Sequence, residues 1–181
     1  MSKAVLITGG AGFIGCNYAA RLIGAGHNVT IVDNLSRKGN DSNMAWLREQ
    51  FGDGFTFVKG DIRDAELMVE LTKNVEAIFH LAGQVAVTTS VVDPREDFEI
   101  NALGTFNVLE GARLSGNKPL FLFASTNKVY GGMYDISVAE AETRWQYADY
   151  PHGLPESQPL DFHSPYGCSK GAGDQLSLIH I

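Results

Sequence analysis

The residues best placed to do chemistry are a tyrosine and a lysine near the end of the chain. Tyr166 and Lys170 stand four residues apart, in a segment that Ser164-Pro165 can start as a helix, so both side chains share one helix face. An ammonium ~4 Å from a phenolate, at an effective dielectric constant of ~20, stabilises that phenolate by about 4 kcal/mol. The tyrosine can then act as a base near neutral pH. A surface pair without a catalytic role is the alternative interpretation.

Thr126 is the natural partner of this pair. It follows the apolar run at residues 120–124, which we expect to be a strand. The carboxyl ends of parallel strands are where such sheets bind their ligands. The threonine hydroxyl could therefore donate a hydrogen bond to the same substrate oxygen from which Tyr166 takes a proton.

A glycine-rich loop stands at the other end of the chain. Residues 8–15 read TGGAGFIG and contain both the spacing G-x-G-x-x-G and the spacing G-x-x-G-x-x-G, between an expected strand at 4–8 and an expected helix at about 13–25. In that position Gly9, Gly12 and Gly15 permit a tight turn, and backbone N–H groups approach a pyrophosphate at the positive end of a helix. A glycine-rich turn that binds nothing is the alternative.

An acidic residue follows the second expected strand. Asp33 ends the run at 29–33, where a carboxylate can accept hydrogen bonds from both hydroxyls of an adenosine ribose and would repel a 2′-phosphate. This favours NAD over NADP, although the positive charges of Arg37 and Lys38 nearby weakly favour NADP. Asp61, just after the third expected strand, either meets the adenine edge or serves as a turn or cap residue.

These residues need a scaffold, and the hydrophobic pattern supplies one. Apolar runs of strand type alternate with helical patterns and place five strands in sequence, followed by a long irregular loop at about 132–163. Such alternation implies right-handed crossovers and a doubly wound, Rossmann-type parallel sheet of the α/β class. His80 falls inside the fourth strand, where a core histidine is the simpler interpretation.

Composition excludes several other classes. The chain has 181 residues, enough for about one domain, with 44% hydrophobic residues and a formal net charge of −7. The charge and the lack of a basic stripe disfavour nucleic acid and anionic membranes as partners. No apolar run has the length of a membrane span. Cys16 and Cys168 match no metal spacing, predict no metal site, and suggest free thiols in a reducing cytoplasm.

Taken together, these motifs resemble the extended short-chain dehydrogenase/reductase family of nucleotide-sugar epimerases and dehydratases. The resemblance rests on residues 8–15, Asp33-Asn34, Asp61-Ile62, the run His80-Leu81-Ala82-Gly83, Asn101, and Tyr166 with Lys170. Two longer stretches, 125–131 and 160–171, resemble the branch of that family that epimerises CDP-linked sugars at C2. In that branch a bound NAD oxidises the C2 hydroxyl to a ketone and then returns the hydride to the opposite face.

The resemblance implies a role for each matching residue, with NAD as cofactor and a CDP-linked nucleotide sugar as substrate. Phe13 and Ile14 would offer backbone N–H groups to the pyrophosphate, and Asp33 and Asn34 would hold the adenosine ribose. Asp61 and Ile62 would flank the adenine. The phosphate and nicotinamide side would be lined by Leu81, Ala82, Gly83 and Asn101. The chemistry would be done by Thr126, Tyr166 and Lys170, and Lys170 would also hold the nicotinamide ribose.

The same resemblance predicts how the chain is organised. Residues 1–175 correspond to an NAD-binding domain with the Tyr–Lys helix, and 176–181 form an off-pattern tail. The family also has a sixth strand and a C-terminal substrate domain, which these 181 residues do not contain. We therefore expect the chain alone to be inactive, and the full-length protein to be a homo-oligomer.

Two alternatives to a C2 epimerase stay open at this level. One is a 4-epimerase or another oxidoreductase of the same superfamily, and the other is an NAD-binding scaffold without catalysis, which would not need Thr126, Tyr166 and Lys170 together. A 4,6-dehydratase is disfavoured. Enzymes of that kind carry Asp-Glu directly after the threonine, whereas this chain has Asn127 and Lys128, which cannot replace a carboxylic acid and its base.

Overall fold

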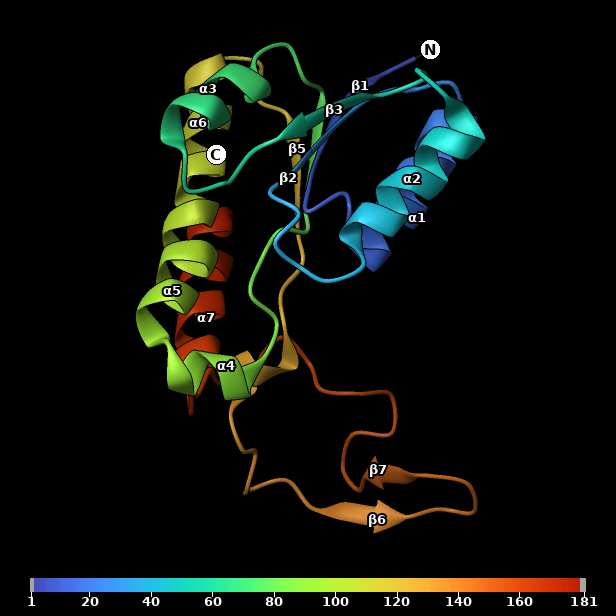
Figure 1. Ribbon diagram of the computed structural model, residues 1–181. Coiled ribbons are helices and arrows are strands. Elements are labelled where there is room, and N and C mark those ends of the chain that lie inside the picture. The colour runs from blue at the N-terminus through green and yellow to red at the C-terminus, as the bar shows by residue number, and fades with distance from the viewer. Residues whose placement is uncertain (1, 180–181) are drawn as a thin grey trace.

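The computed structural model describes residues 2–179 and shows a five-stranded parallel sheet in the order β3-β2-β1-β4-β5 (Figure 1). Each strand pairs with its neighbours in parallel register, so all five carboxyl ends meet at one edge. The expected doubly wound α/β fold is confirmed. The strands are β1 (Ala4–Thr8), β2 (Asn28–Asp33), β3 (Thr56–Lys59), β4 (Ala77–His80) and β5 (Leu120–Phe123).

Helices cover both faces of this sheet (Figure 1). One face carries α1 (Phe13–Gly24) and α2 (Asn40–Phe51). The opposite face carries α3 (Ala65–Thr72), α6 (Thr105–Ser115) and α7 (Pro165–Ile179), with the short helices α4 (Val87–Val92) and α5 (Pro94–Phe98) packed against α7. A parallel sheet covered in this way has strands that are apolar on both sides, as the sequence of β1 predicts.

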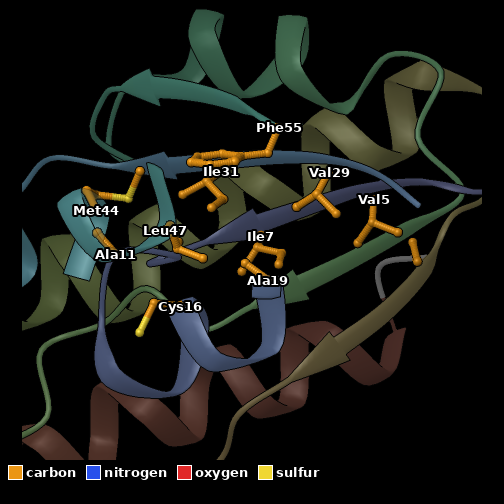
Figure 2. Close-up of a cluster of buried hydrophobic side chains, with 11 residues drawn as sticks. Val5, Ile7, Ala11, Cys16, Ala19, Val29, Ile31, Met44, Leu47 and Phe55 are labelled. Carbon is orange, nitrogen blue, oxygen red and sulfur yellow. The ribbon is translucent and has the colours of Figure 1, made fainter. Parts of the chain in front are cut away.

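Two buried clusters hold these layers together. Figure 2 shows the first, in which Val5 and Ile7 of β1 pack with Val29 and Ile31 of β2 against α1 and α2. The second lies on the other face, where residues of β1, β2 and β4 meet α3 and α6. Alternate residues of each strand therefore point into different clusters, which fixes the register of the sheet.

Three polar residues start helices by accepting hydrogen bonds from backbone N–H groups of the first turn. The Asp64 carboxylate accepts a hydrogen bond from Leu67 N at the first turn of α3, and Asp93 accepts one from Glu96 N at the start of α5. The Ser164 hydroxyl oxygen accepts one from the Gly167 N–H at the start of α7. Each side chain satisfies a backbone donor that the first turn of a helix leaves without an intrahelical partner.

The structure extends the sequence prediction in three places. The segment between the second and third strands contains a twelve-residue helix, α2. The long loop contains a two-stranded hairpin, β6 (Val138–Glu140) with β7 (Trp145–Tyr147), which lies apart from the main sheet (Figure 1). Between α5 and α6 the chain forms a π-helix, η1 (Glu99–Gly104), a rare element that often marks functional sites.

His80 is a neutral core residue, as expected. Its Nδ1 lies 2.8 Å from Thr8 Oγ1 and its Nε2 lies 2.9 Å from Thr105 Oγ1. Because the Thr105 hydroxyl donates to the Asn101 carbonyl, its oxygen accepts from Nε2–H, and Thr8 donates to Nδ1. Complete burial, together with the positive charge of Lys170, lowers the pKa of His80 to about 3.

Candidate functional site

One cavity of about 960 Å³ opens at the carboxyl ends of the strands and collects nearly all of the expected site residues. It extends from the glycine loop, past the ends of β2 and β3, to the start of α7. The expected residues that line it are Gly9, Gly12, Phe13, Ile14, Gly15, Asp33, Asn34, Asp61, Ile62, Leu81, Ala82, Gly83, Tyr166 and Lys170. Asn101 and Thr126 are not among its lining residues.

The glycine loop is shaped so that larger side chains do not fit. Gly9 has a φ of +68°, and a Cβ atom there would lie 2.5 Å from Ala82 N. A Cβ on Gly15 would collide with the Gly9 carbonyl oxygen. Gly12 caps α1 without a side chain, and the first turn of that helix carries no acidic residue. The backbone N–H groups of this turn are thus open to an anion from the cavity.

Asp33 has a structural task besides the expected ribose contact. Its carboxylate accepts hydrogen bonds from Ala11 N (3.1 Å), Leu35 N (2.8 Å) and Asn40 Nδ2 (3.1 Å). Three of about four acceptor positions are therefore used within the chain. Asp33 fixes the glycine loop and the start of the following segment while its side chain borders the cavity.

Asp61 is a turn residue that also borders the cavity, and its contact with adenine stays a prediction. It borders the cavity, and its carboxylate forms a turn by accepting from Arg63 N, while the Arg63 guanidinium pairs with both oxygens at 3.0 and 2.7 Å. Asn34 Nδ2 donates to it at 2.9 Å. The hydrogen bonds from the Arg63 side chain, with smaller effects of its backbone N–H and of Asn34, lower the pKa of Asp61 to about 2.

Tyr166 and Lys170 are buried, which rules out the surface-pair interpretation. Lys170 is 7% exposed, and its ammonium donates to the Ala124 carbonyl at 2.6 Å and lies 4.1 Å from the centre of the Phe123 ring. Tyr166 is anchored through its backbone N–H, which donates to Ser90 Oγ. Burial lowers the pKa of Lys170 to about 8, against the opposing charges of Asp174 and Asp97.

Replacing Lys170 by methionine is expected to stabilise the fold near neutral pH. A fall in pKa from 10.5 to about 8 corresponds to a cost of up to about 3 kcal/mol for keeping the ammonium charged in the folded state. The cost is complete below pH 8 and disappears as the pH rises from 8 towards 10.5. Urea unfolding of both proteins at pH 7 and pH 10 measures it. A stability difference that is the same at both pH values would contradict this account.

Thr126 stands beside the cavity without lining it. Its Oγ1 accepts from Lys128 N at 3.3 Å and so starts the 3₁₀ helix η2 (Asn127–Tyr130). Its neighbours Ala124 and Ser125 are lining residues, and the Ser125 hydroxyl donates to Asp174 at 2.7 Å. The structure thus places Thr126 just beyond the end of β5, where the Ala124 carbonyl holds Lys170. Because Thr126 only accepts from Lys128, its own hydroxyl proton is not used in that contact.

Asn101 acts from behind the cavity wall. It is 1% exposed within the π-helix, and its Oδ1 accepts from Gln84 N at 2.9 Å. A Cβ on Gly83 would lie 3.0 Å from the same oxygen. Asn101 therefore shapes the segment after β4 that forms the wall, a task different from direct contact with a ligand in the cavity.

Two groups of lining residues were not predicted. One is the segment 36–40 together with Asn43, which borders the end of the cavity beside Asp33. In this segment, only Arg37 and Lys38 can be noted from the sequence, because their positive charges would favour a 2′-phosphate. The other group is the stretch 84–86 with Thr89, Glu96 and Ile100. No motif marks it, because it reaches the cavity through the short helices α4 and α5 and the π-helix.

Comparison with known families agrees with this geometry. The family model for GDP-mannose 4,6 dehydratase matches residues 6–178, which is most of the chain. The chain belongs to this family of NAD-dependent nucleotide-sugar epimerases and dehydratases. Its resemblance to the extended short-chain dehydrogenase/reductases is thereby confirmed.

Individual relatives are similar over nearly the whole chain. It is 49% identical to the CDP-paratose 2-epimerase of Salmonella typhi over 176 residues, which cover 96% of this chain and 52% of the relative. A UDP-Glc/GlcNAc 4-epimerase from Campylobacter jejuni superposes with a TM-score of 0.80 at 26% identity, covering 99% of this chain and 49% of that one. The dTDP-glucose 4,6-dehydratase DesIV of Streptomyces venezuelae, with NAD bound, superposes with a TM-score of 0.78 at 31% identity, covering 96% and 50%.

The chain spans about half the length of the curated relatives that it matches. Within residues 2–179, no helix is long and apolar enough to cross a membrane. The same residues contain no group of three or more metal-ligating side chains.

Proposed function

We propose that this chain is the NAD-binding and catalytic half of an epimerase that acts on a nucleotide sugar, specifically on C2 of a CDP-linked sugar. The observation that carries the proposal is the cavity itself, in which the glycine loop and Asp33 lie at one end and Tyr166 with Lys170 at the other. The choice of a CDP-linked sugar and of C2 is supported by the 49% identity to a CDP-paratose 2-epimerase.

The cavity fits NAD at its adenosine and pyrophosphate end. Gly9 and Gly15 keep the loop free of side chains, and the open first turn of α1 offers N–H groups to a pyrophosphate. The negative charge of Asp33 favours a free ribose over a 2′-phosphate. When bound, NAD supplies a hydride acceptor for the sugar carbon and later returns the hydride.

The residues of this chain manage the proton that accompanies the hydride. Tyr166 takes the proton of the sugar hydroxyl during oxidation and returns it during reduction. The Lys170 ammonium, held by the Ala124 carbonyl, stabilises the phenolate in a buried site where its charge is only weakly screened. Thr126 stands beside the cavity with its hydroxyl proton free of the Lys128 contact, and we expect it to donate to the same sugar oxygen once the substrate is bound.

Asn127 and Lys128 argue against a dehydratase, although the family model carries that description. Eliminating water from the sugar needs an acid and a base near the carbons that lose it. An asparagine amide does not exchange a proton in this role, and a lysine has the opposite charge to a carboxylate. The second candidate is a 4-epimerase, which is favoured by the likeness to the Campylobacter jejuni enzyme.

A substrate comparison tests the proposal. A full-length protein that carries this chain is incubated with CDP-paratose, UDP-glucose or dTDP-glucose, and the sugar products are identified by NMR. We expect inversion at C2 of the CDP-linked sugar to be the fastest reaction. Faster inversion of UDP-glucose at C4 would favour the second candidate. A 4-keto-6-deoxy product would contradict the argument from Asn127 and Lys128.

Residues 1–181 alone are expected to give no turnover. The relatives have a second half of about equal length, and in the proposed enzyme that half holds the nucleotide of the substrate. Without it, the binding energy that positions the sugar is lost, which reduces the rate as well as the affinity. An assay of the purified chain with CDP-paratose checks this. Steady turnover would show that the substrate site lies within these residues.

A further inference from the structure

The mechanism proposed above gives no task to the buried carboxylate of Asp97. This side chain lies on α5 and is 1% exposed. It accepts hydrogen bonds from Gln84 Nε2 at 2.8 Å, from Asn101 Nδ2 at 3.2 Å and from the Ser169 hydroxyl. Within residues 2–179, no lysine, arginine or histidine forms a salt bridge with it. A buried charge whose hydrogen-bond partners are all neutral lowers the stability of the fold, so a functional role for Asp97 would explain its presence.

The three donors come from three different segments of the chain, of which one lines the cavity and two lie behind its wall. Gln84 follows β4 and lines the cavity, and Asn101 belongs to the π-helix behind it. Ser169 lies on α7 between the two catalytic positions, directly before Lys170. Asn101 Nδ2 also donates to Ser169 Oγ at 3.2 Å, which closes the network. Asp97 therefore connects the catalytic helix to the wall of the site.

The charge of Asp97 also acts on Lys170. Besides the neighbouring Tyr166, the titratable groups that face the Lys170 ammonium are Asp174 on its own helix, Asp97 on α5 and His80 on β4. His80 is neutral, and the half-exposed Asp174 carboxylate is partly screened by solvent. Both carboxylates oppose the effect of burial on the pKa of Lys170, Asp174 more strongly than Asp97, and of the two only that of Asp97 is fully buried.

We propose that Asp97 is a positioning residue, which holds α7 against the cavity wall and supplies a buried negative charge to the ammonium of Lys170. The proposal rests on the proposed function of Tyr166 and Lys170. If the ammonium must stay charged to stabilise the phenolate, a lysine this deeply buried needs a compensating charge nearby. Asp97 supplies this charge from behind the wall, without occupying space in the cavity.

The substitution Asp97→Asn removes the negative charge of the side chain and keeps its size and shape. The asparagine oxygen can still accept from Gln84 and Asn101. The Ser169 hydroxyl can turn to the Tyr166 carbonyl, which already lies 3.1 Å away, and accept from the new amide. Asp93→Asn is the matched control, because it removes one charge from the exposed start of the same helix and asparagine remains a good cap.

The first measurement is the pKa of Lys170 itself, which does not depend on any enzymatic activity. The protein is labelled at lysine Cε, the Lys170 signal is assigned by its loss in Lys170→Met, and the signals are titrated by NMR. We expect a pKa of about 8 in the unchanged protein. Asp97→Asn should lower it by about half a unit to one unit, and Asp93→Asn should leave it in place. An unchanged value in Asp97→Asn would overturn the electrostatic part of the proposal.

The second measurement is the pH profile of kcat in a full-length protein that carries this chain. Asp97→Asn should shift the loss of activity on the alkaline side to lower pH by the same amount, because Lys170 loses its proton earlier. A uniform decrease without a shift would mean a purely structural role. Ser169→Ala keeps the charge and loosens the network, so it should lower kcat without moving the profile. An unchanged kcat in Ser169→Ala would overturn the positioning part.

The two measurements also separate this proposal from the proposed function. If the full-length protein has no epimerase activity, the titration of Lys170 still decides whether Asp97 controls its charge. If the protein is an active epimerase but Asp97→Asn changes neither the pKa of Lys170 nor the pH profile, only the electrostatic role of Asp97 is refuted.

Discussion

Replacing Tyr166 by phenylalanine is expected to lower kcat by about 10²- to 10⁴-fold in a full-length protein that carries this chain. The change removes one oxygen atom, and with it the group that exchanges a proton with the sugar hydroxyl; general acid–base catalysis contributes a factor of this size. The backbone contact of Tyr166 to Ser90 does not involve the hydroxyl and remains. NAD affinity, measured by calorimetry, should therefore change by only a few-fold.

Tyr134→Phe is the control for this substitution. Tyr134 is 88% exposed, stacks on His163 in the long loop and does not line the cavity. Its loss of a hydroxyl should leave kcat within about twofold. A kcat for Tyr166→Phe within the same range, with NAD still bound, would exclude Tyr166 as the base.

Replacing Asp33 by alanine is expected to weaken NAD binding by about 10²- to 10⁴-fold and to narrow the preference for NAD over NADP. The acceptor position that the chain leaves unused can take a charge-assisted hydrogen bond from the ribose, which contributes about 1.5–3 kcal/mol, and the loss of an anchor for the glycine loop accounts for the rest of this range. The anchor is lost because the Ala11 N–H loses its acceptor. Calorimetric titration of both dinucleotides checks the expectation.

Asn40→Ala serves as the comparison for Asp33→Ala. Asn40 donates to the same carboxylate at 3.1 Å, so its loss disturbs the local structure but keeps the negative charge and the acceptors. NAD affinity should fall much less than in Asp33→Ala, and discrimination against NADP should persist. Equal NAD affinity in the unchanged protein and in Asp33→Ala would reduce Asp33 to a residue that only organises the loop.

Most of the fold could be predicted from local patterns. The strand at residues 4–8, the glycine loop and the caps at Asp64 and Asp93 are signals contained within a few residues each. Because parallel strands need crossover helices, these signals also determine the topology. Helix α2 has only a weak sequence signal, since Met44 and Leu47 are the only apolar residues among its buried ones. The hairpin β6–β7 carries no alternating pattern long enough to predict it.

The site residues that a ligand would contact directly could be predicted from motifs. The residues that only hold other residues of the site in place could not. The glycine loop, Asp33, Tyr166 and Lys170 have fixed spacings that the chemistry demands. By contrast, Asp97 and Gln84 meet through contacts between residues thirteen positions apart, and Ser169 joins them from 72 positions away. No local pattern contains such contacts. The same reason explains why Asn101 supports the wall from behind.

The most direct test of the central claim is the origin of the hydrogen at the inverted carbon. The full-length protein is run on CDP-paratose in deuterated water, and deuterium at C2 of the product is measured by NMR and mass spectrometry. If the hydride leaves to a bound NAD and returns, as we propose, C2 keeps its original hydrogen and the product carries no deuterium there. Deuterium from the solvent at C2 would contradict the account, because inversion would then proceed by removal and return of a proton.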